Sequence, residues 1–245
     1  MAGTKTESII NGLKTEIVKV VSEKLSAEAN SSHDVAIAWK KKQDDAVEAI
    51  KDLLAKHLTD SKIISPKAKS TYPDIKIVNA EGAFAIDIKV NEDSKNPWFD
   101  MARLDTMLES RIDKYIEEWE LVIKFRNTDG KFIKAFFNLF REVVGYNKYS
   151  EGIKYRPYDG KVRPKTWADF DSDKTYWNTK EEFLVGIEKS IKYRWKSNIS
   201  KHLVAKLSEV EKEEFKKLFD KPIEIPEEPD DDENGSLDLF GKMGN

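Results

Sequence analysis

The sequence contains no cysteine, which excludes disulfide bonds and thiolate metal sites. Its three histidines, His33, His57 and His202, lie far apart and lack the spacing of zinc ligands. No long hydrophobic run occurs, so we expect neither a signal peptide nor a membrane-spanning helix. Together these absences predict a soluble cytoplasmic protein that does not act at a membrane.

The charge of the chain is unevenly distributed. The 245 residues carry 42 basic and 45 acidic side chains, a net charge of −3. Residues 221–245 hold eight of the acids and only two lysines, so the other 220 residues keep 40 basic and 37 acidic side chains, a net charge of +3. A chain with 39% apolar residues has enough for one large α/β domain or two small ones. The positive remainder permits nucleic-acid binding without requiring it.

The stretch from Tyr72 to Lys89 predicts two β-strands joined by a short turn. The turn falls at residues 79–82, where Gly82 is available for a positive φ. In the second strand Asp87 and Lys89 share one face, and the residues between and around them form an apolar face: Phe84, Ile86, Ile88 and Val90. Because the apolar face can be buried in the core, the polar face has to line something else.

The charges of this hairpin indicate what its polar face lines. Asp74 on the first strand and Asp87 on the second provide oxygen ligands of the kind that Mg²⁺ prefers, together with waters and substrate phosphate. Lys89 projects from the same face as Asp87 and is able to reach a water placed beside it. The alternative is a hairpin whose charged face is simply solvated.

This arrangement resembles the Pro-Asp…(Asp/Glu)-X-Lys, or PD-(D/E)XK, signature of the restriction-endonuclease-like nucleases. Its opening at Tyr72-Pro73-Asp74 and its close at residues 85–89 look most like type II restriction endonucleases, which cut double-stranded DNA as homodimers. The resemblance implies that Asp74 and Asp87 bind Mg²⁺ and that Lys89 is the catalytic lysine. It also implies an α/β (α+β) fold with a mixed β-sheet flanked by helices.

Two amphipathic helices are expected before the hairpin, over residues 5–29 and 34–58. The first is expected to pack on its own domain or, alternatively, to contribute to a homodimer contact. The second carries Glu48 near the edge of its apolar stripe. The resemblance implies that a helix in this place often adds an acid near the metal, so Glu48 is a weak candidate ligand; a solvated acid is the preferred interpretation.

Two further segments are candidates for DNA contact. The polar stretch 91–98 follows the second strand directly and contains Asn91, Lys95 and Asn96, which are able to read base edges or hold the backbone; a plain connection is the alternative. Residues 146–167 combine turns, aromatic residues and basic side chains, and we expect the basic ones to contact phosphates or bases: Lys154, Arg156, Lys161, Arg163 and Lys165.

The rest of the chain predicts the remaining elements of one domain. We expect a helix over 99–118, a central strand over 119–125, a strand over 131–144 that runs into a turn of helix, and a capped helix over 179–196. Residues 1–220 are predicted to form a single endonuclease domain with an N-terminal helical part. The acidic, proline-containing segment 221–245 is predicted to be a disordered tail. Within it, Leu237–Phe240 weakly resembles the peptide by which bacterial replication and repair proteins dock to the sliding clamp.

Three functions therefore stand as hypotheses. The favoured one is a Mg²⁺-dependent type II restriction endonuclease that cuts double-stranded DNA at a fixed sequence. The second keeps this chemistry but reads DNA structure, as in a repair, recombination or phage nuclease. The third is a non-catalytic, DNA-binding adaptor associated with a sliding clamp, whose acidic face binds no metal.

Overall fold

The computed structural model describes residues 3–27, 35–65, 72–94 and 96–203. Met1–Lys192 form one compact unit and Tyr193–Asn245 belong to a second, so the first unit is described by itself. Three predictions lie outside the described residues and stay predictions. They concern Lys95, the tail 221–245 and, within that tail, the segment Leu237–Phe240 that resembles a clamp-binding peptide.

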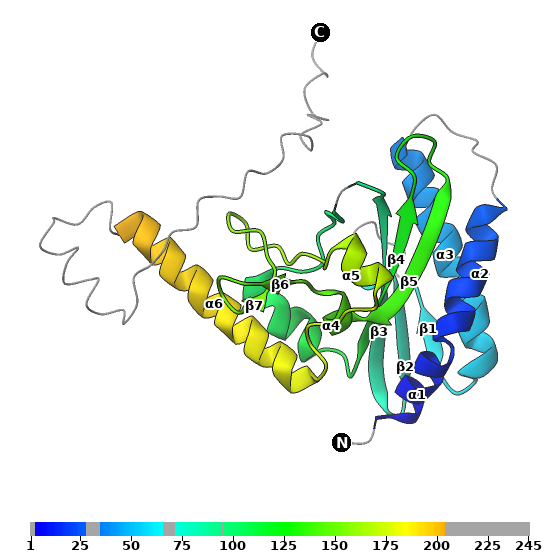
Figure 1. Cartoon of the computed structure of the whole chain (residues 1–245). Helices are drawn as coiled ribbons and strands as arrows, with labels where there is room; N and C mark the ends of the chain where they lie inside the picture. Colours follow the sequence, from blue (N-terminus) through cyan, green and yellow to red (C-terminus); the bar gives the residue numbers. More distant parts are fainter. Residues whose placement is uncertain (1–2, 28–34, 66–71, 95, 204–245) are drawn as a thin grey trace, which may run out of the picture. The chain divides into compact units, whose positions relative to one another are not determined.

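A five-stranded mixed β-sheet forms the centre of the first unit (Figure 1). Its strands follow the order of the chain: β1 (Lys62–Ile64), β2 (Ile75–Asn79), β3 (Gly82–Glu92), β4 (Glu118–Phe125) and β5 (Phe132–Leu139). All neighbouring strands are antiparallel except β3 and β4, which are parallel. The predicted mixed sheet flanked by helices is thus confirmed, as are the hairpin and the strands that follow it; β1 was not predicted.

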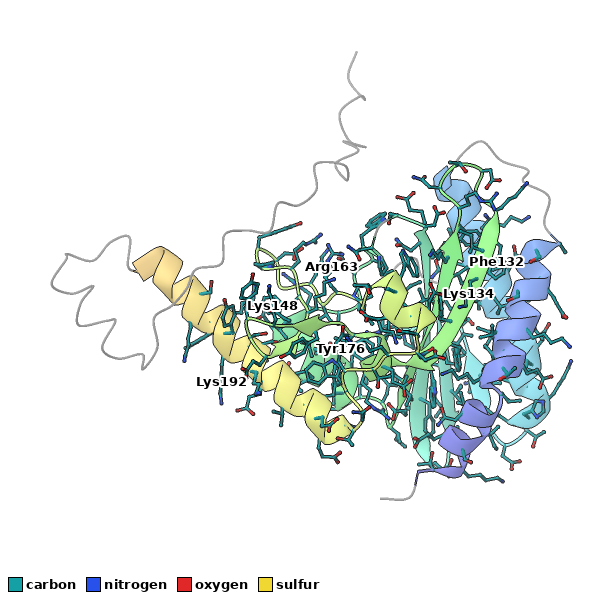
Figure 2. The ribbon with its side chains drawn as sticks, in the orientation of Figure 1. Phe132, Lys134, Lys148, Arg163, Tyr176 and Lys192 are labelled. Atoms are coloured by element: carbon teal, nitrogen blue, oxygen red, sulfur yellow. The ribbon has the colours of Figure 1, made fainter. Side chains whose placement is uncertain are left out.

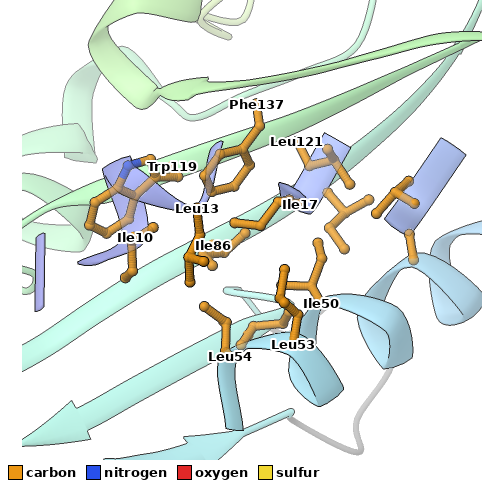
Figure 3. Packing of buried hydrophobic residues seen from close by; sticks show 14 of the residues in the cluster. Ile10, Leu13, Ile17, Ile50, Leu53, Leu54, Ile86, Trp119, Leu121 and Phe137 are labelled. Carbon is orange, nitrogen blue, oxygen red and sulfur yellow. The ribbon is translucent and has the colours of Figure 1, made fainter. Parts of the chain in front are cut away.

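Three helices cover one face of the sheet: α1 (Lys5–Gly12), α2 (Lys14–Ser26) and α3 (Val35–His57) (Figure 1). The single helix expected over 5–29 is divided at Leu13. Figure 3 shows Ile17 of α2 and Ile50 of α3 packing against Ile86 and Leu121 of the sheet. Every second residue of β3 and β4 joins this core, because successive side chains of a strand point to opposite faces. The alternate residues, including Asp87 and Lys89, are therefore directed to the other face.

The connection between the parallel strands runs over that other face. A parallel pair requires a crossover of a dozen or more residues, and residues 93–117 supply it. The helix predicted over 99–118 is wrong: the segment forms only a 3₁₀ turn, η1 (Leu104–Thr106), and a short π-helical turn, η2 (Leu108–Ile112). In this segment the apolar Leu108 is exposed, whereas Arg111 is buried. The contacts made by Arg111 override the helical periodicity of the apolar residues.

The hairpin turn has the predicted conformation. Gly82 has a φ of 133°, which an L-residue side chain would strain. The neighbouring Glu81 accepts hydrogen bonds from the backbone N–H groups of Lys5 (2.8 Å) and Thr6 (2.9 Å), and so caps the start of α1. The N-terminal helix is thereby fixed to the tip of the β2–β3 hairpin.

Residues 140–192, which follow β5 within the first unit, lie on the side of the sheet away from α2 and α3, as Figure 2 shows for Lys148, Arg163 and Tyr176. Its elements are α4 (Phe140–Val143), β6 (Tyr146–Asn147), β7 (Gly152–Ile153), α5 (Trp167–Asp171) and α6 (Lys180–Leu203). The predicted passage from strand into helix is confirmed at Phe140. The predicted cap of the last helix is confirmed too, because Glu182 N donates to Thr179 Oγ1 at 3.1 Å. Within the described residues, no helix is both long and apolar enough to cross a membrane.

Candidate active site

The candidate site lies where β2 and β3 separate. β2 begins at Ile75, paired with Ile86, while β3 continues to Glu92. The backbone N–H of Ile88 therefore has no strand partner on that side, and it donates instead to Asp74 Oδ2 at 2.7 Å. This hydrogen bond holds the Asp74 carboxylate beside β3, next to Asp87.

A side chain from α3 fixes the other oxygen of Asp74. Gln43 Nε2 donates to Asp74 Oδ1 at 2.9 Å and to the carbonyl of Ile88 at 3.3 Å. Burial, and then the neighbouring Asp87 carboxylate, raise the pKa of Asp74 to about 6, although both hydrogen bonds oppose the rise. Asp74 is thus oriented by two donors and still holds a proton more readily than a free aspartate.

Asp87 and Lys89 form an ion pair on the polar face of β3. Lys89 Nζ lies 2.6 Å from Asp87 Oδ2, and 22% of the Lys89 side chain is exposed against 8% for Asp87. Burial alone would raise the pKa of Asp87, but the cations of Lys89 and Arg111 lower it. Burial likewise opposes the charge of Lys89, yet the carboxylates of Asp87 and Glu120 raise its pKa. Both groups are therefore charged at neutral pH.

Arg111 is the buried centre of the cluster. Its guanidinium lies 3.5 Å from Asp87 Oδ2 and 3.3 Å from a carboxylate oxygen of both Glu118 and Glu120. It also donates to the carbonyl of Met101 at 2.9 Å. The rings of Tyr72 and Phe140 lie over it, with centroids at 3.9 and 4.2 Å. Burial disfavours its charge, but the surrounding carboxylates raise its pKa, so the guanidinium stays ionised.

Two glutamates of β4 complete the cluster. Glu120 is paired in register with Asp87, and burial together with that carboxylate raises the pKa of Glu120 to about 8. Its Oε2 atom is buried without a hydrogen-bond partner. Glu118 accepts a hydrogen bond from the Tyr72 hydroxyl, and burial raises the pKa of Glu118. Two buried acids at alternate positions of the same face make this strand unusual for the middle of a sheet.

The balance of charge is compatible with a bound cation. Four carboxylates surround two cations, Lys89 and Arg111, so full ionisation leaves an excess of two negative charges. A divalent ion offsets such an excess, and Mg²⁺ takes one or two carboxylates plus waters and substrate phosphate. No group of three or more His, Cys, Asp or Glu side chains within the described ranges is arranged to hold a metal alone. Asp74 and Asp87, together with the partnerless oxygen of Glu120, nevertheless fit Mg²⁺ in chemical type.

The structure brings Asp74, Asp87 and Lys89 together and leaves Glu48 apart. Glu48 lies on the exposed side of α3 with 68% of its side chain accessible, and it pairs with Lys24 of α2 at 3.7 Å. From α3 it is Gln43, five residues earlier, that reaches the site. Five residues turn a helix by more than one full turn, so the two side chains point in different directions. The expectation that Glu48 binds the metal is therefore corrected: Gln43, which is not an acid, is the residue of α3 that reaches the site.

Of the residues expected to contact DNA, Asn91 and Lys165 are buried and Lys154 is half-buried. Asn91 is only 1% exposed because it belongs to β3, and its side-chain oxygen accepts from Trp98 N at 3.4 Å. Lys165, also 1% exposed, donates to the carbonyl of Lys174 at 2.7 Å. Burial, followed by the charge of Arg163, lowers the pKa of Lys154. Asn91 and Lys165 are thus scaffold residues, and the expectation that they touch DNA is corrected on that ground.

Arg156, Lys161 and Arg163 are partly exposed and are organised around one acid. Arg163 Nη1 lies 2.7 Å and Arg156 Nη2 3.8 Å from the carboxylate of Asp100, and Lys161 pairs with the same group. Asn96 is exposed on the stretch that leads from β3 to this acid. DNA contact by these side chains stays a prediction.

Four residues of the cluster were not identified from the sequence: Gln43, Arg111, Glu118 and Glu120. Glu118 and Glu120 carried a signal, since two acids at alternate positions of a strand rich in apolar residues are costly to bury unless they are paired. Gln43 is one polar residue on a highly charged helix, and Arg111 occurs at a helical spacing among apolar residues. Neither pattern distinguishes them from solvated side chains.

Comparison with known protein families found no match, and a search of curated proteins found none either. The function therefore has to be inferred from the chemistry of the site.

Proposed function

We propose that the protein is a Mg²⁺-dependent DNA endonuclease with a restriction-endonuclease-like fold and active site. The observation that carries the proposal is the meeting of Asp74, Asp87 and Lys89 at the point where β2 and β3 separate. The mixed sheet and its flanking helices are compatible with that fold. Two carboxylates beside a lysine on rigid strands, rather than on a mobile loop, are suited to hydrolysing a phosphodiester bond.

Each residue has a role that follows from its surroundings. Asp74 and Asp87 would hold Mg²⁺, which when bound neutralises the scissile phosphate and acidifies the attacking water. Lys89 keeps its proton at neutral pH because acids flank it, and this favours stabilising negative charge over accepting a proton from water. Gln43 orients Asp74, and Arg111 holds Asp87 in place from the interior.

Two forms of this activity differ in the substrate. The first is the sequence-specific cleavage of double-stranded DNA by a homodimer, as in type II restriction. The second is cleavage of DNA with a distorted or branched structure, and exposed aromatic residues beside the site favour it. Digestion of a long plasmid separates the two, since discrete fragments support the first and junction-dependent products the second.

The test of the proposal is nicking of a supercoiled plasmid with and without Mg²⁺. Asp87→Asn should lower the rate by more than about 100-fold, because changes at residues that only hydrogen-bond to metal ligands already cost about 10–100-fold. Asp113→Asn is the matched control, since Asp113 is an exposed acid of the crossover. It should retain the wild-type rate.

A second readout separates loss of metal from loss of fold. Saturating Mg²⁺ should raise the melting temperature of the wild type and of Asp113→Asn, because a ligand stabilises the state that binds it. Asp87→Asn should melt cooperatively but without this Mg²⁺ effect. Absence of Mg²⁺-dependent nicking in the wild type, with DNA binding retained, would instead favour the non-catalytic adaptor.

A further inference from the structure

The crossover segment 97–104 connects the candidate active site with the accessible basic residues. At one end, Trp98 N donates to Asn91, which lies two residues beyond Lys89 on the same face of β3, about 7 Å along the strand. Further along, the carbonyl of Met101 accepts from Arg111, the residue that holds Asp87. The segment is thus attached to the site at two points.

The same segment is also attached to the turn at residues 156–163. Met101 N donates to Val162 O at 3.1 Å, Val162 N donates to Ala102 O at 2.8 Å, and Leu104 N donates to Gly160 O at 2.8 Å. These backbone hydrogen bonds form a short ladder between two segments that are about sixty residues apart in the sequence. The turn is therefore held at a fixed place beside the site.

Exposed aromatic rings and partly exposed cations gather along this connection, in what we term the aromatic rim. Trp98 is 52% exposed, and its carbonyl accepts from Arg163. Tyr158 is 71% exposed, with the Arg156 guanidinium 4.6 Å from its ring centroid. Asp100 joins the two parts by pairing with the cations of the rim, which are Arg156, Lys161 and Arg163.

The composition of the rim matches one class of ligand. Three cations stand against two acids, Asp100 and Asp159, so the rim is net positive and suits a phosphate backbone. Exposed indole and phenol rings offer flat faces on which nucleobases stack. Bases inside an intact duplex are already stacked on each other, so such faces are accessible only to bases that have left the stack.

We propose that the aromatic rim binds an unpaired DNA strand next to the cleavage site, with Trp98 and Tyr158 stacking on its bases. The arginines and Lys161 then hold the backbone that links those bases to the scissile phosphate. This inference rests on the proposed function, because it takes the strand at the rim to be continuous with the one at Asp87 and Lys89. Its substrate is a junction, flap or splayed end, and not an uninterrupted duplex.

The test compares the full-length protein on two fluorescent oligonucleotides without Mg²⁺, so that neither is cut. One is an intact duplex, and the other has the same sequence with a splayed single-stranded arm. Fluorescence anisotropy should show tighter binding to the splayed DNA. Trp98→Ala should weaken that binding about 5- to 150-fold, the range of one lost base-stacking contact, and change duplex binding less than about twofold.

Two further variants refine the test. Trp98→Phe retains a ring and should restore most of the affinity for splayed DNA. Tyr149→Ala is the control, because Tyr149 is 53% exposed and lies near a lysine but has no described contact with the rim. It should bind both DNAs as the wild type does. Melting curves establish that each variant is folded.

The outcomes separate this inference from the proposed function. Equal losses by Trp98→Ala on both DNAs, or no loss on either, would overturn the stacking role even if the plasmid is nicked normally. A preference for splayed DNA that depends on Trp98 would support the rim even in a protein that fails to nick. Only the nicking assay with Asp87→Asn bears on the catalytic proposal itself.

Discussion

The two faces of the five-stranded sheet are made from alternate residues of the same strands, but they are stabilised in different ways. On one face Ile86 and Leu121 pack against three helices in a continuous apolar core. On the other face Asp87, which follows Ile86, and Glu120, which precedes Leu121, lie against the buried Arg111. The apolar face gains stability simply by leaving water, whereas each buried charge on the polar face depends on a specific partner.

This contrast between the two faces indicates which of them is able to carry a functional site. A packed apolar face contributes stability and has no group that acts on a substrate. The polar face holds more carboxylates than cations, so ionising all of its carboxylates costs stability. Substitutions on the two faces should therefore differ in how far they lower the free energy of unfolding. Above all, they should differ in how that loss depends on pH.

The largest effect is expected for Arg111→Met. Removing this guanidinium leaves Asp87, Glu118 and Glu120 facing each other in the interior, which should lower the free energy of unfolding by about 3–5 kcal/mol. Urea unfolding at pH 8 and pH 5 measures it, and the loss should shrink at pH 5 because the glutamates take up protons. Arg103→Met, at an exposed position of the same crossover, should change stability by less than about 0.5 kcal/mol. If both variants lost the same free energy of unfolding, the ionic network would not be what stabilises the polar face.

On the apolar face, Leu121→Ala should lower the free energy of unfolding by about 2–5 kcal/mol, since it opens a cavity in a fully buried position. The loss of unfolding free energy in Leu121→Ala should be the same at pH 5 and pH 8, unlike the loss in Arg111→Met. Ile133→Ala, at a 40% exposed position of β5, is the matched control and should cost less than about 1 kcal/mol. A strong pH dependence in Leu121→Ala would show that the two faces are not independent.

The metal-free wild type should lose stability as the pH rises. The folded-state pKa of Asp74 is raised to about 6 and that of Glu120 to about 8, above their unfolded values. Stability from a raised pKa is complete below the unfolded pKa and is lost as the pH rises through the folded one, here between about pH 4 and 8. Glu120→Gln should abolish the part of the loss above pH 6, on the order of 2 kcal/mol. Urea unfolding in EDTA measures it, and an identical pH profile for Glu120→Gln and wild type would contradict the buried position of this acid.

The sequence predicted the apolar face better than the polar one, for a physical reason. Alternation in β3, the turn at Gly82 and the helical stripes are local patterns, and burial of apolar side chains needs no particular partner. The pairing of Asp74 with β3 was also indicated, because a short spacing fixes it. Arg111 and Gln43 act through partners on other elements of the fold, and no local pattern encodes such partners. The segment 99–118 shows the consequence, since its apolar spacing indicates a helix and its tertiary contacts prevent one.

The smallest expected effect concerns Gln43, which links the two faces because it extends from a helix of the apolar core to an acid of the polar site. Its N–H favours the ionised form of Asp74 and so lowers the pKa of that group. In Gln43→Ala the pKa of Asp74 should rise further, and a proton should compete better with Mg²⁺ for the carboxylate. We expect about two- to fivefold more Mg²⁺ for half-maximal nicking at pH 6.5, the effect of one hydrogen bond, and almost no change at pH 8.5, where Asp74 is ionised in both proteins. Lys40→Ala, an exposed change on the same helix, should leave the Mg²⁺ requirement unaltered at both pH values. A Mg²⁺ requirement raised equally at both pH values would mean that Gln43 acts on the shape of the site and not on the proton of Asp74.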